Sequence, residues 1–146
     1  MTSINKNAPV KAKKSIQIDA SPSRVWELLS DIDNWHEWHE DIKEAKINGQ
    51  LATGSTFDWK SGGTKIHSTL HTVTPQEKIG WSGKAFGAYA IHNWTLSDVN
   101  GKTEVSVEES MEGALMRFFR GFMQNTLEKG MDSWLKQLKK AAEKIP

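Results

Sequence analysis

The hydrophobic pattern of this 146-residue chain changes its period abruptly at Gly113. From Lys43 to Met111, apolar and polar residues alternate in short runs, which is typical of β-strands with side chains on opposite faces. Beyond Gly113, apolar residues recur every three or four positions as far as about Lys144, which is typical of an amphipathic helix. The pattern therefore predicts a sheet followed by one C-terminal helix over about residues 114–143.

A helix of about 30 residues would be roughly 45 Å long, which exceeds the width of a small sheet. We expect it to lie across the sheet and to bend, if at all, at Gly121 or Gly130. Its apolar side is made by Leu115, Phe119, Phe122, Met123, Leu127, Met131, Trp134 and Leu138.

Turn-forming residues divide the alternating region into short strands. These turns are Asn48-Gly49, Thr53-Gly54, Ser61-Gly62-Gly63, Thr74-Pro75, Gly87 and Asn100-Gly101. Consecutive strands joined by such short connections must run antiparallel. The expected strands are residues 43–48, 55–60, 64–74, 77–84, 88–98 and 102–111.

The N-terminal part predicts one further strand and two short helices. Residues 15–19 alternate as a strand does, which brings the sheet to seven strands. Ser21 and Pro22 mark a helix start, because serine caps the first turn and proline lacks only an N–H that would be unpaired there. A second helical segment is expected around Trp35. Residues 1–13 are polar and are interpreted as a flexible tail, with a single domain over residues 14–146.

Composition excludes several classes of protein. The 19 basic and 18 acidic residues give a net charge of +1, which argues against a nucleic-acid partner. The absence of cysteine excludes disulfides, thiolate metal sites and cysteine nucleophiles. The Gly62-Gly63 pair lacks the lysine and the spacing of a phosphate-binding loop, and we expect no cofactor.

The same composition indicates where the chain would be found. No stretch approaches the roughly 20 apolar residues of a membrane-spanning helix, so we expect no stable membrane insertion. The N-terminal residues contain no apolar run of the kind found in signal peptides, which favours a cytoplasmic location. The oligomeric state is left open by the sequence.

Several sequence motifs resemble those of a known superfamily. They are residues 20–26 (ASPSRVW), 35–38 (WHEW), 47–57 (INGQLATGSTF), 79–81 (IGW) and 91–94 (IHNW). In this order they resemble the START and birch-pollen-allergen-like helix-grip superfamily, and within it the polyketide cyclase/dehydrase-like branch. The resemblance implies an α+β helix-grip fold, with a curved seven-stranded antiparallel sheet around a long C-terminal helix. It also implies a ligand pocket between sheet and helix, without fixing the chemistry.

Four of the five histidines are expected to be exposed to solvent. His36 and His39 are three residues apart, which is not the spacing of the zinc metalloprotease pattern, so a solvated helix face is expected rather than a metal site. His67 and His71 share one strand and would lie about 13 Å apart. They are expected to face solvent, because apolar neighbours take the opposite face.

The fifth histidine, His92, is expected to face Glu109 across a hairpin. If Asn100-Gly101 forms the turn, counting outward places His92 opposite Glu109 on a face that is otherwise apolar. A slip of two residues would separate the two while keeping both faces. The pair has three interpretations: a general acid–base couple, an anchor for the polar end of a ligand, or a self-satisfied pair that fixes register.

Large apolar side chains supply the walls of the expected cavity. Tryptophan, present seven times, suits cavity walls as well as solid cores. The residues expected to contact a ligand are Phe57, Trp59, Trp81, Trp94, Met111, Phe122, Met123 and Thr126.

Two functions follow from these residues. The first is binding of a hydrophobic small molecule or lipid in the cavity. The alternative is a polyketide cyclase/dehydratase-like enzyme acting on such a ligand, with His92 and Glu109 as catalytic residues. A protein-interaction module would remain if the interior were filled.

Overall fold

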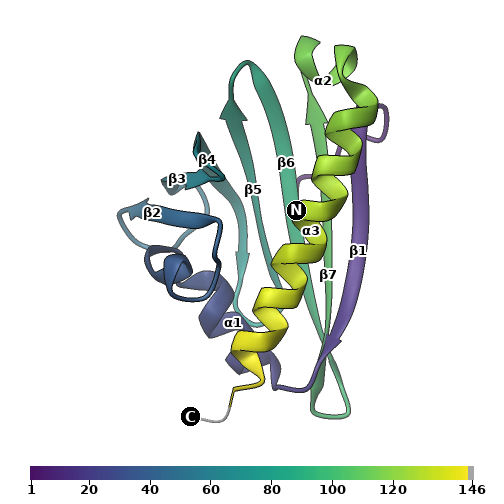
Figure 1. The fold of residues 1–146 in the computed structure, drawn as a ribbon. Helices are drawn as coiled ribbons and strands as arrows, with labels where there is room; N and C mark the ends of the chain where they lie inside the picture. The colour runs from purple at the N-terminus through teal and green to yellow at the C-terminus, as the bar shows by residue number, and fades with distance from the viewer. Residues whose placement is uncertain (145–146) are drawn as a thin grey trace.

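Seven antiparallel strands form one curved sheet, and a long helix lies against it (Figure 1). The computed structural model describes residues 1–144. The strands are β1 (Val10–Ile18), β2 (Ile42–Asn48), β3 (Thr56–Ser61), β4 (Thr64–Thr74), β5 (Lys78–Ala85), β6 (Ala88–Val99) and β7 (Lys102–Glu112), in the spatial order β1-β7-β6-β5-β4-β3-β2. The helices are α1 (Pro22–Ser30), the 3-10 helix η1 (Ile32–Glu37), α2 (Ala114–Phe118) and α3 (Arg120–Ala142).

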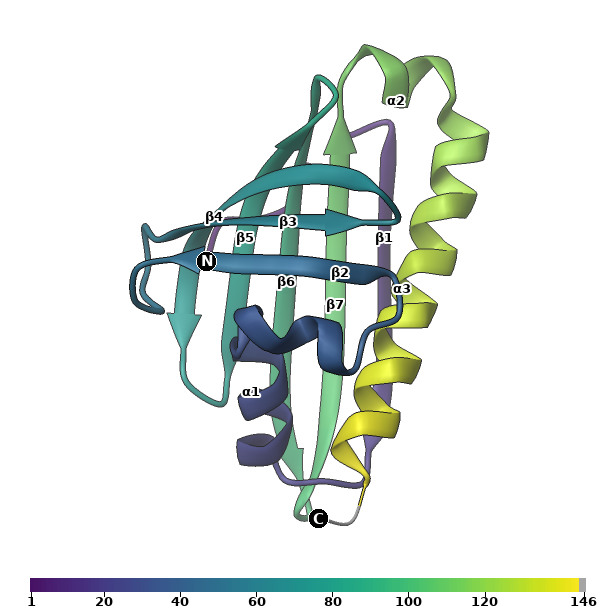
Figure 2. The same cartoon turned by 60° about the vertical axis from the view of Figure 1, so that its left-hand side comes forward.

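This arrangement confirms the helix-grip fold expected from the sequence. Each strand from β2 to β7 begins and ends within one residue of its predicted bounds. Ser21 caps α1 as predicted, since its side chain accepts a hydrogen bond from the Arg24 backbone N–H. In Figure 2, β2 and β3 turn across the front of the sheet, while α1 and η1 close one end of it.

A bulge in β4 marks the place where the sheet curves. Leu70 pairs with Trp81 and Thr72 pairs with Gly80, so His71 is an extra residue between two paired positions. Such a bulge bends a strand and increases its twist.

The first strand begins earlier than predicted, at Val10, inside the expected tail of residues 1–13. Val10 is fully buried and pairs with Met111. The preceding residues lie over the outer face of the sheet, where the Asn5 N–H donates to Ser110 Oγ at 3.0 Å and Asn93 Nδ2 donates to the Thr2 carbonyl at 2.8 Å. The prediction of a flexible tail is therefore wrong for residues 10–13, which belong to β1.

Helix α3 covers the free edge of β1. The side-chain amide of Gln124 accepts from the Lys11 N–H at 3.1 Å and donates to the Lys11 carbonyl at 2.7 Å. Further along, Lys139 Nζ donates to the Gln17 carbonyl at 3.0 Å. These bonds hold the helix beside the sheet.

The predicted C-terminal helix is interrupted at Phe119, whose φ of −108° and ψ of 38° lie outside helical values. The short helix α2 buries Met116, whereas the buried side of α3 begins at Leu127. The interruption redirects the chain between the end of β7 and the axis of α3 (Figure 1). It replaces the bend expected at a glycine.

An aromatic cluster fills part of the space between sheet and helix. Trp35 of η1 is fully buried, and its ring centroid lies 5.2–5.6 Å from those of Phe57, Trp59, Trp81 and Trp134. The Trp35 Nε1–H donates to the Leu29 carbonyl at 3.0 Å. Trp59, Trp81 and Trp134 of this cluster also line the space that remains open.

Candidate functional site

An internal cavity of about 260 Å³ lies between the inner face of the sheet and α3. Strands β3 to β7 supply one wall and α3 supplies the other. The lining side chains are mostly apolar, and they include Trp59, Ile66, Trp81, Met111, Met123, Leu127, Met131 and Trp134.

Five of the eight residues predicted to contact a ligand line this cavity. They are Trp59, Trp81, Met111, Met123 and Thr126. Their contact with a ligand stays a prediction.

The other three lie elsewhere. Phe57 and Trp94 point inward but are fully buried, because Trp35 packs over Phe57 and Trp134 lies 5.5 Å from Trp94. Phe122 is 68% exposed. One residue corresponds to about 100° of helical rotation, so the position before Met123 points away from the cavity.

Some lining residues were missed by the sequence reasoning. On α3 these are Leu127, Gly130, Met131 and Trp134. They follow Met123 at the spacing of one helix face, so the helical period of the sequence could have identified them as lining residues.

His92 and Glu109 meet inside the cavity as the hairpin count predicted. They are paired residues of β6 and β7, and His92 Nδ1 contacts Glu109 Oε1. Both line the cavity, and their side chains are only 7% and 12% exposed. Because two acceptors would repel, a proton must lie between the ring nitrogen and the carboxylate.

The His92 ring is held between two indoles. It stacks on Trp81 at a centroid distance of 4.6 Å and on Trp94 at 5.6 Å. Its second nitrogen, Nε2, is buried and has no hydrogen-bond partner within residues 1–144. With Nδ1–H bonded to a carboxylate, Nε2 of a neutral ring carries a lone pair that can accept a hydrogen bond or a proton.

Two of the hydroxyl groups at the cavity wall already form one hydrogen bond each. Ser68 Oγ accepts from Trp59 Nε1 at 3.0 Å, and Thr126 Oγ1 donates to the Phe122 carbonyl at 3.0 Å. Among the polar atoms of the cavity wall, His92 Nε2 stands out because it is buried and has no partner within residues 1–144.

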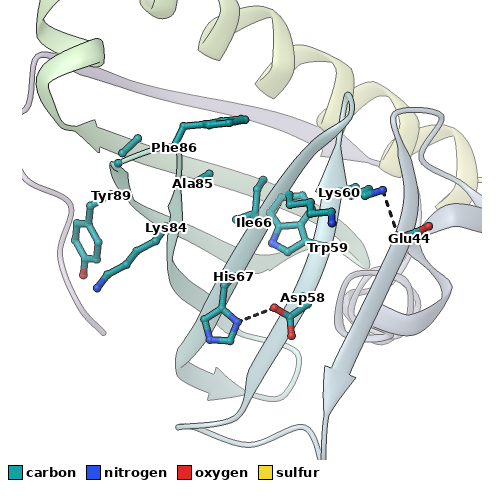
Figure 3. Close-up of a pocket in the computed structure, with 13 residues that line it drawn as sticks. Glu44, Asp58, Trp59, Lys60, Ile66, His67, Lys84, Ala85, Phe86 and Tyr89 are labelled. Carbon is teal, nitrogen blue, oxygen red and sulfur yellow. Dashed lines mark hydrogen bonds and ion pairs between the residues drawn. The ribbon is translucent and has the colours of Figure 1, made fainter.

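A larger surface groove of about 810 Å³ adjoins the cavity (Figure 3). It lies where the β3–β4 and β5–β6 hairpins diverge, beyond the last β4–β5 pair of His67 and Lys84. Cavity and groove share Trp59, Ile66, Lys84, Ala85 and Ala88.

Ion pairs occupy the outer part of this groove. Lys60 Nζ lies 3.9 Å from Glu44, and His67 Nδ1 lies 2.7 Å from Asp58 Oδ1 (Figure 3). Hydrogen bonds from Asn48 and His67 lower the pKa of Asp58.

The remaining histidines divide between exposed and buried positions. His36 and His67 are exposed, and His71 is partly buried on the outer face. His39 is 2% exposed and lies 4.4 Å from the Trp134 ring, so the expectation of a solvated face is wrong for it. Across the described part of the chain, no three His, Asp or Glu side chains gather as metal ligands would.

The sequence of this chain matches a known family over nearly its whole length. The family is described as "Polyketide cyclase / dehydrase and lipid transport", and it matches residues 9–143. No curated protein matches closely enough to count as a relative. Over residues 1–144, no helix is both long and apolar enough to cross a membrane.

Solved structures share the fold at low sequence identity. A hypothetical protein from Helicobacter pylori superposes with a TM-score of 0.85 at 15% identity, covering 98% of both chains. The Zhui aromatase/cyclase from Streptomyces gives 0.79 at 13% identity, covering 91% of this chain and 93% of that one. A START superfamily protein from Mycobacterium smegmatis gives 0.65 at 15% identity, covering 88% and 98%. These likenesses establish the fold alone.

Proposed function

The chain belongs to the polyketide cyclase/dehydrase and lipid transport family, and on that premise we propose that it binds an apolar small molecule or lipid in the internal cavity, with a polar group of that ligand at His92. The observation that carries the proposal is the buried Nε2 of His92, which has no hydrogen-bond partner among residues 1–144 and lies in a mostly apolar wall. A buried polar atom without a partner is costly, and a ligand hydroxyl would remove that cost.

The cavity volume limits the ligand. At about 260 Å³ the cavity is slightly below the roughly 300–1,000 Å³ of common ligand pockets. A larger ligand would extend past Trp59 and Ile66 into the adjoining groove. We therefore expect a ligand with a compact apolar part inside and any bulkier or charged part in the groove.

Catalysis is the second candidate function, and a specific arrangement favours it. A carboxylate that holds one imidazole nitrogen leaves the other free to act as a general base. Glu109 and His92 have this arrangement, and the structurally similar Zhui protein is an aromatase/cyclase. Under this alternative, His92 Nε2 would accept a proton from the ligand and Glu109 would stabilise the charged ring.

Displacement of a bound apolar dye tests the binding proposal. Nile red should bind to the wild-type protein and be displaced by fatty acids or polyaromatic compounds. His92→Phe keeps an aromatic ring between Trp81 and Trp94 but removes Nε2. The variant should therefore bind hydroxylated ligands about 1–3 kcal/mol more weakly, while Nile red still binds. His36→Gln changes an exposed histidine that lines neither the cavity nor the groove, so it is the matched control. The absence of dye binding to the folded wild-type protein would refute the proposal.

Ligand identity comes from mass spectrometry of small molecules that copurify with the protein. The catalytic alternative predicts that Glu109→Gln abolishes turnover of that ligand, whereas its binding survives. The binding proposal predicts that the recovered ligand stays unchanged on incubation with the protein. A cytoplasmic location and the absence of a nucleic-acid partner stay predictions from composition.

A further inference from the structure

Large aromatic side chains project into solvent at one end of the molecule. Phe118 is 82% exposed, Phe86 is 79% exposed and Phe122 is 68% exposed. Phe119 and Leu115 are each 47% exposed, and the rings of Phe118 and Phe119 lie 5.1 Å apart. We call these five residues the aromatic end. Isolated exposed apolar residues are ordinary, but several gathered at one place mark an interaction site.

These residues come from two segments that lie together. Leu115, Phe118, Phe119 and Phe122 belong to α2, the break and the first turn of α3, whereas Phe86 is in the β5–β6 turn. A Cβ on Gly113 would stand 2.8 Å from the Gly87 carbonyl oxygen, so the start of α2 touches that turn. Both views place α2 and the β5–β6 turn at the same end of the fold (Figures 1 and 2).

Phe86 occupies a backbone conformation that its side chain disfavours. The Phe86-Gly87 turn has φ values of 50° and 73°, and the Asn100-Gly101 turn has φ values of 56° and 85°. Asparagine tolerates this left-handed region, whereas a bulky residue there is an outlier. Burial of the side chain does not offset the cost of this backbone conformation, because the Phe86 ring is exposed. Neither the turn nor the core therefore accounts for a phenylalanine at this position.

Basic residues surround the aromatic end. Arg117 and Arg120 flank Phe118 and Phe119, and both side chains are exposed. Within the described chain neither arginine forms an ion pair. Lys84 lies two residues before Phe86 and lines the groove with it (Figure 3). Exposed aromatic rings mixed with free cations fit the boundary of an anionic lipid bilayer.

We propose that the aromatic end docks reversibly on the surface of an anionic lipid membrane. The phenylalanine rings enter the headgroup region, and Arg117 and Arg120 contact lipid phosphates. A second copy of the chain fits this surface less well, because a two-fold interface uses the same patch of both copies and would enclose Arg117 and Arg120 of each copy in a mostly aromatic contact. The docking surface shares Phe86 with the wall of the groove, so the groove would open beside the membrane.

The test uses flotation with lipid vesicles and needs no knowledge of the cavity ligand. Wild-type protein should float with vesicles of equal parts phosphatidylcholine and phosphatidylglycerol, and less with phosphatidylcholine alone. Phe118→Ser combined with Phe122→Ser should lower partitioning at least about tenfold, because two exposed rings no longer enter the interface. Val99→Ser, at the opposite end of β6, is the control for an exposed apolar residue and should float as wild type does.

Phe86→Asn separates docking from folding. It restores the residue preferred in the turn, so it should raise the melting temperature and lower vesicle binding. Wild-type protein that stays unbound with anionic vesicles would overturn the proposal, as would unchanged binding of the Phe118→Ser/Phe122→Ser variant. A dimer in light scattering that the same two substitutions dissolve would assign the surface to a second copy instead.

Discussion

His71 and Asn93 lie side by side on the outer face of the sheet, directly above Gly80. A Cβ on Gly80 would stand 2.4 Å from His71 Cε1 and 2.7 Å from Asn93 Oδ1. Asn93 is only 2% exposed and is held by its hydrogen bond to the Thr2 carbonyl. The absence of a side chain at position 80 therefore allows the bulge residue and the N-terminal segment to close over the sheet.

Gly80→Ala should lower the free energy of unfolding by about 1–3 kcal/mol, the usual effect of forcing a methyl group into a filled site. Urea denaturation measures this change. Adding His71→Ala removes the nearest atoms, so the double variant should recover part of the loss. A Gly80→Ala protein as stable as wild type would contradict the close approach.

Stability should fall as the pH drops below about 6.5, the ordinary pKa of histidine. Burial lowers the pKa of His39, against the opposing effect of Asp41 and Glu40. Burial likewise lowers the pKa of His71, and the neighbouring Asn93 side chain acts in the opposite direction. Below their ordinary pKa these residues take up protons in the unfolded chain before they do so in the folded protein, so acid favours unfolding.

This pH dependence is measured by urea denaturation at a series of pH values from neutral to mildly acidic. His39→Gln should flatten the decline, because the buried imidazole is gone. His36→Gln, which changes an exposed side chain on the same segment, should keep the wild-type slope. A stability that rises on acidification over this range would contradict the prediction.

The two members of the cavity pair should depend on each other for stability. His92→Phe leaves a buried carboxylate without its partner, and Glu109→Met leaves the imidazole without one. We expect each single change to lower stability by up to about 3–5 kcal/mol, and the double variant to lose less than the two losses combined. A thermodynamic cycle from urea denaturation measures the coupling. Additive losses would show that the contact contributes nothing.

Gly130 lies within α3 at the cavity wall, where a Cβ would meet nothing within 4 Å. Alanine is a better helix former than glycine, so Gly130→Ala should raise stability by about 0.5–1 kcal/mol. Gly130→Phe should instead fill the cavity and lower the affinity for Nile red. Gly121→Ala, in the same helix but outside the cavity lining, should stabilise without changing dye binding.

The sequence was sufficient to predict the hairpin register that places the two residues of the candidate site opposite each other. The Asn100-Gly101 turn and the alternation of β6 and β7 together gave the His92–Glu109 pairing. A slip by one residue would have exchanged the faces, so the apolar pattern allowed few alternatives.

The start of β1 was missed because of Lys14. It lies on the inward-facing side of the strand with Val10 and Ala12, where an apolar residue would complete the alternation. Lys14 forms an ion pair with Asp132 of α3, with Nζ 3.2 Å from Oδ1. This partner is 118 residues away in sequence, so no local pattern could reveal it.

The sequence also could not predict which inward-facing residues belong to the solid core and which line the cavity. Alternation gives the face on which Phe57 and Trp94 lie, but not what covers them. Trp35 of η1 covers Phe57, and Trp134 of α3 lies against Trp94. Which part of an apolar face stays open depends on packing between distant elements.

The Gln124 amide that bonds both backbone groups of Lys11 acts as a substitute for one peptide unit of a neighbouring strand. An uncovered edge strand offers its N–H and C=O groups to strands of other molecules, which is a common route to aggregation. At the other edge, Asp33 Oδ1 accepts from the Ile47 N–H of β2 at 2.8 Å. Side chains thus occupy backbone hydrogen-bonding positions on both edge strands of the sheet. The sheet can therefore stay open around its cavity without pairing with an eighth strand from another molecule.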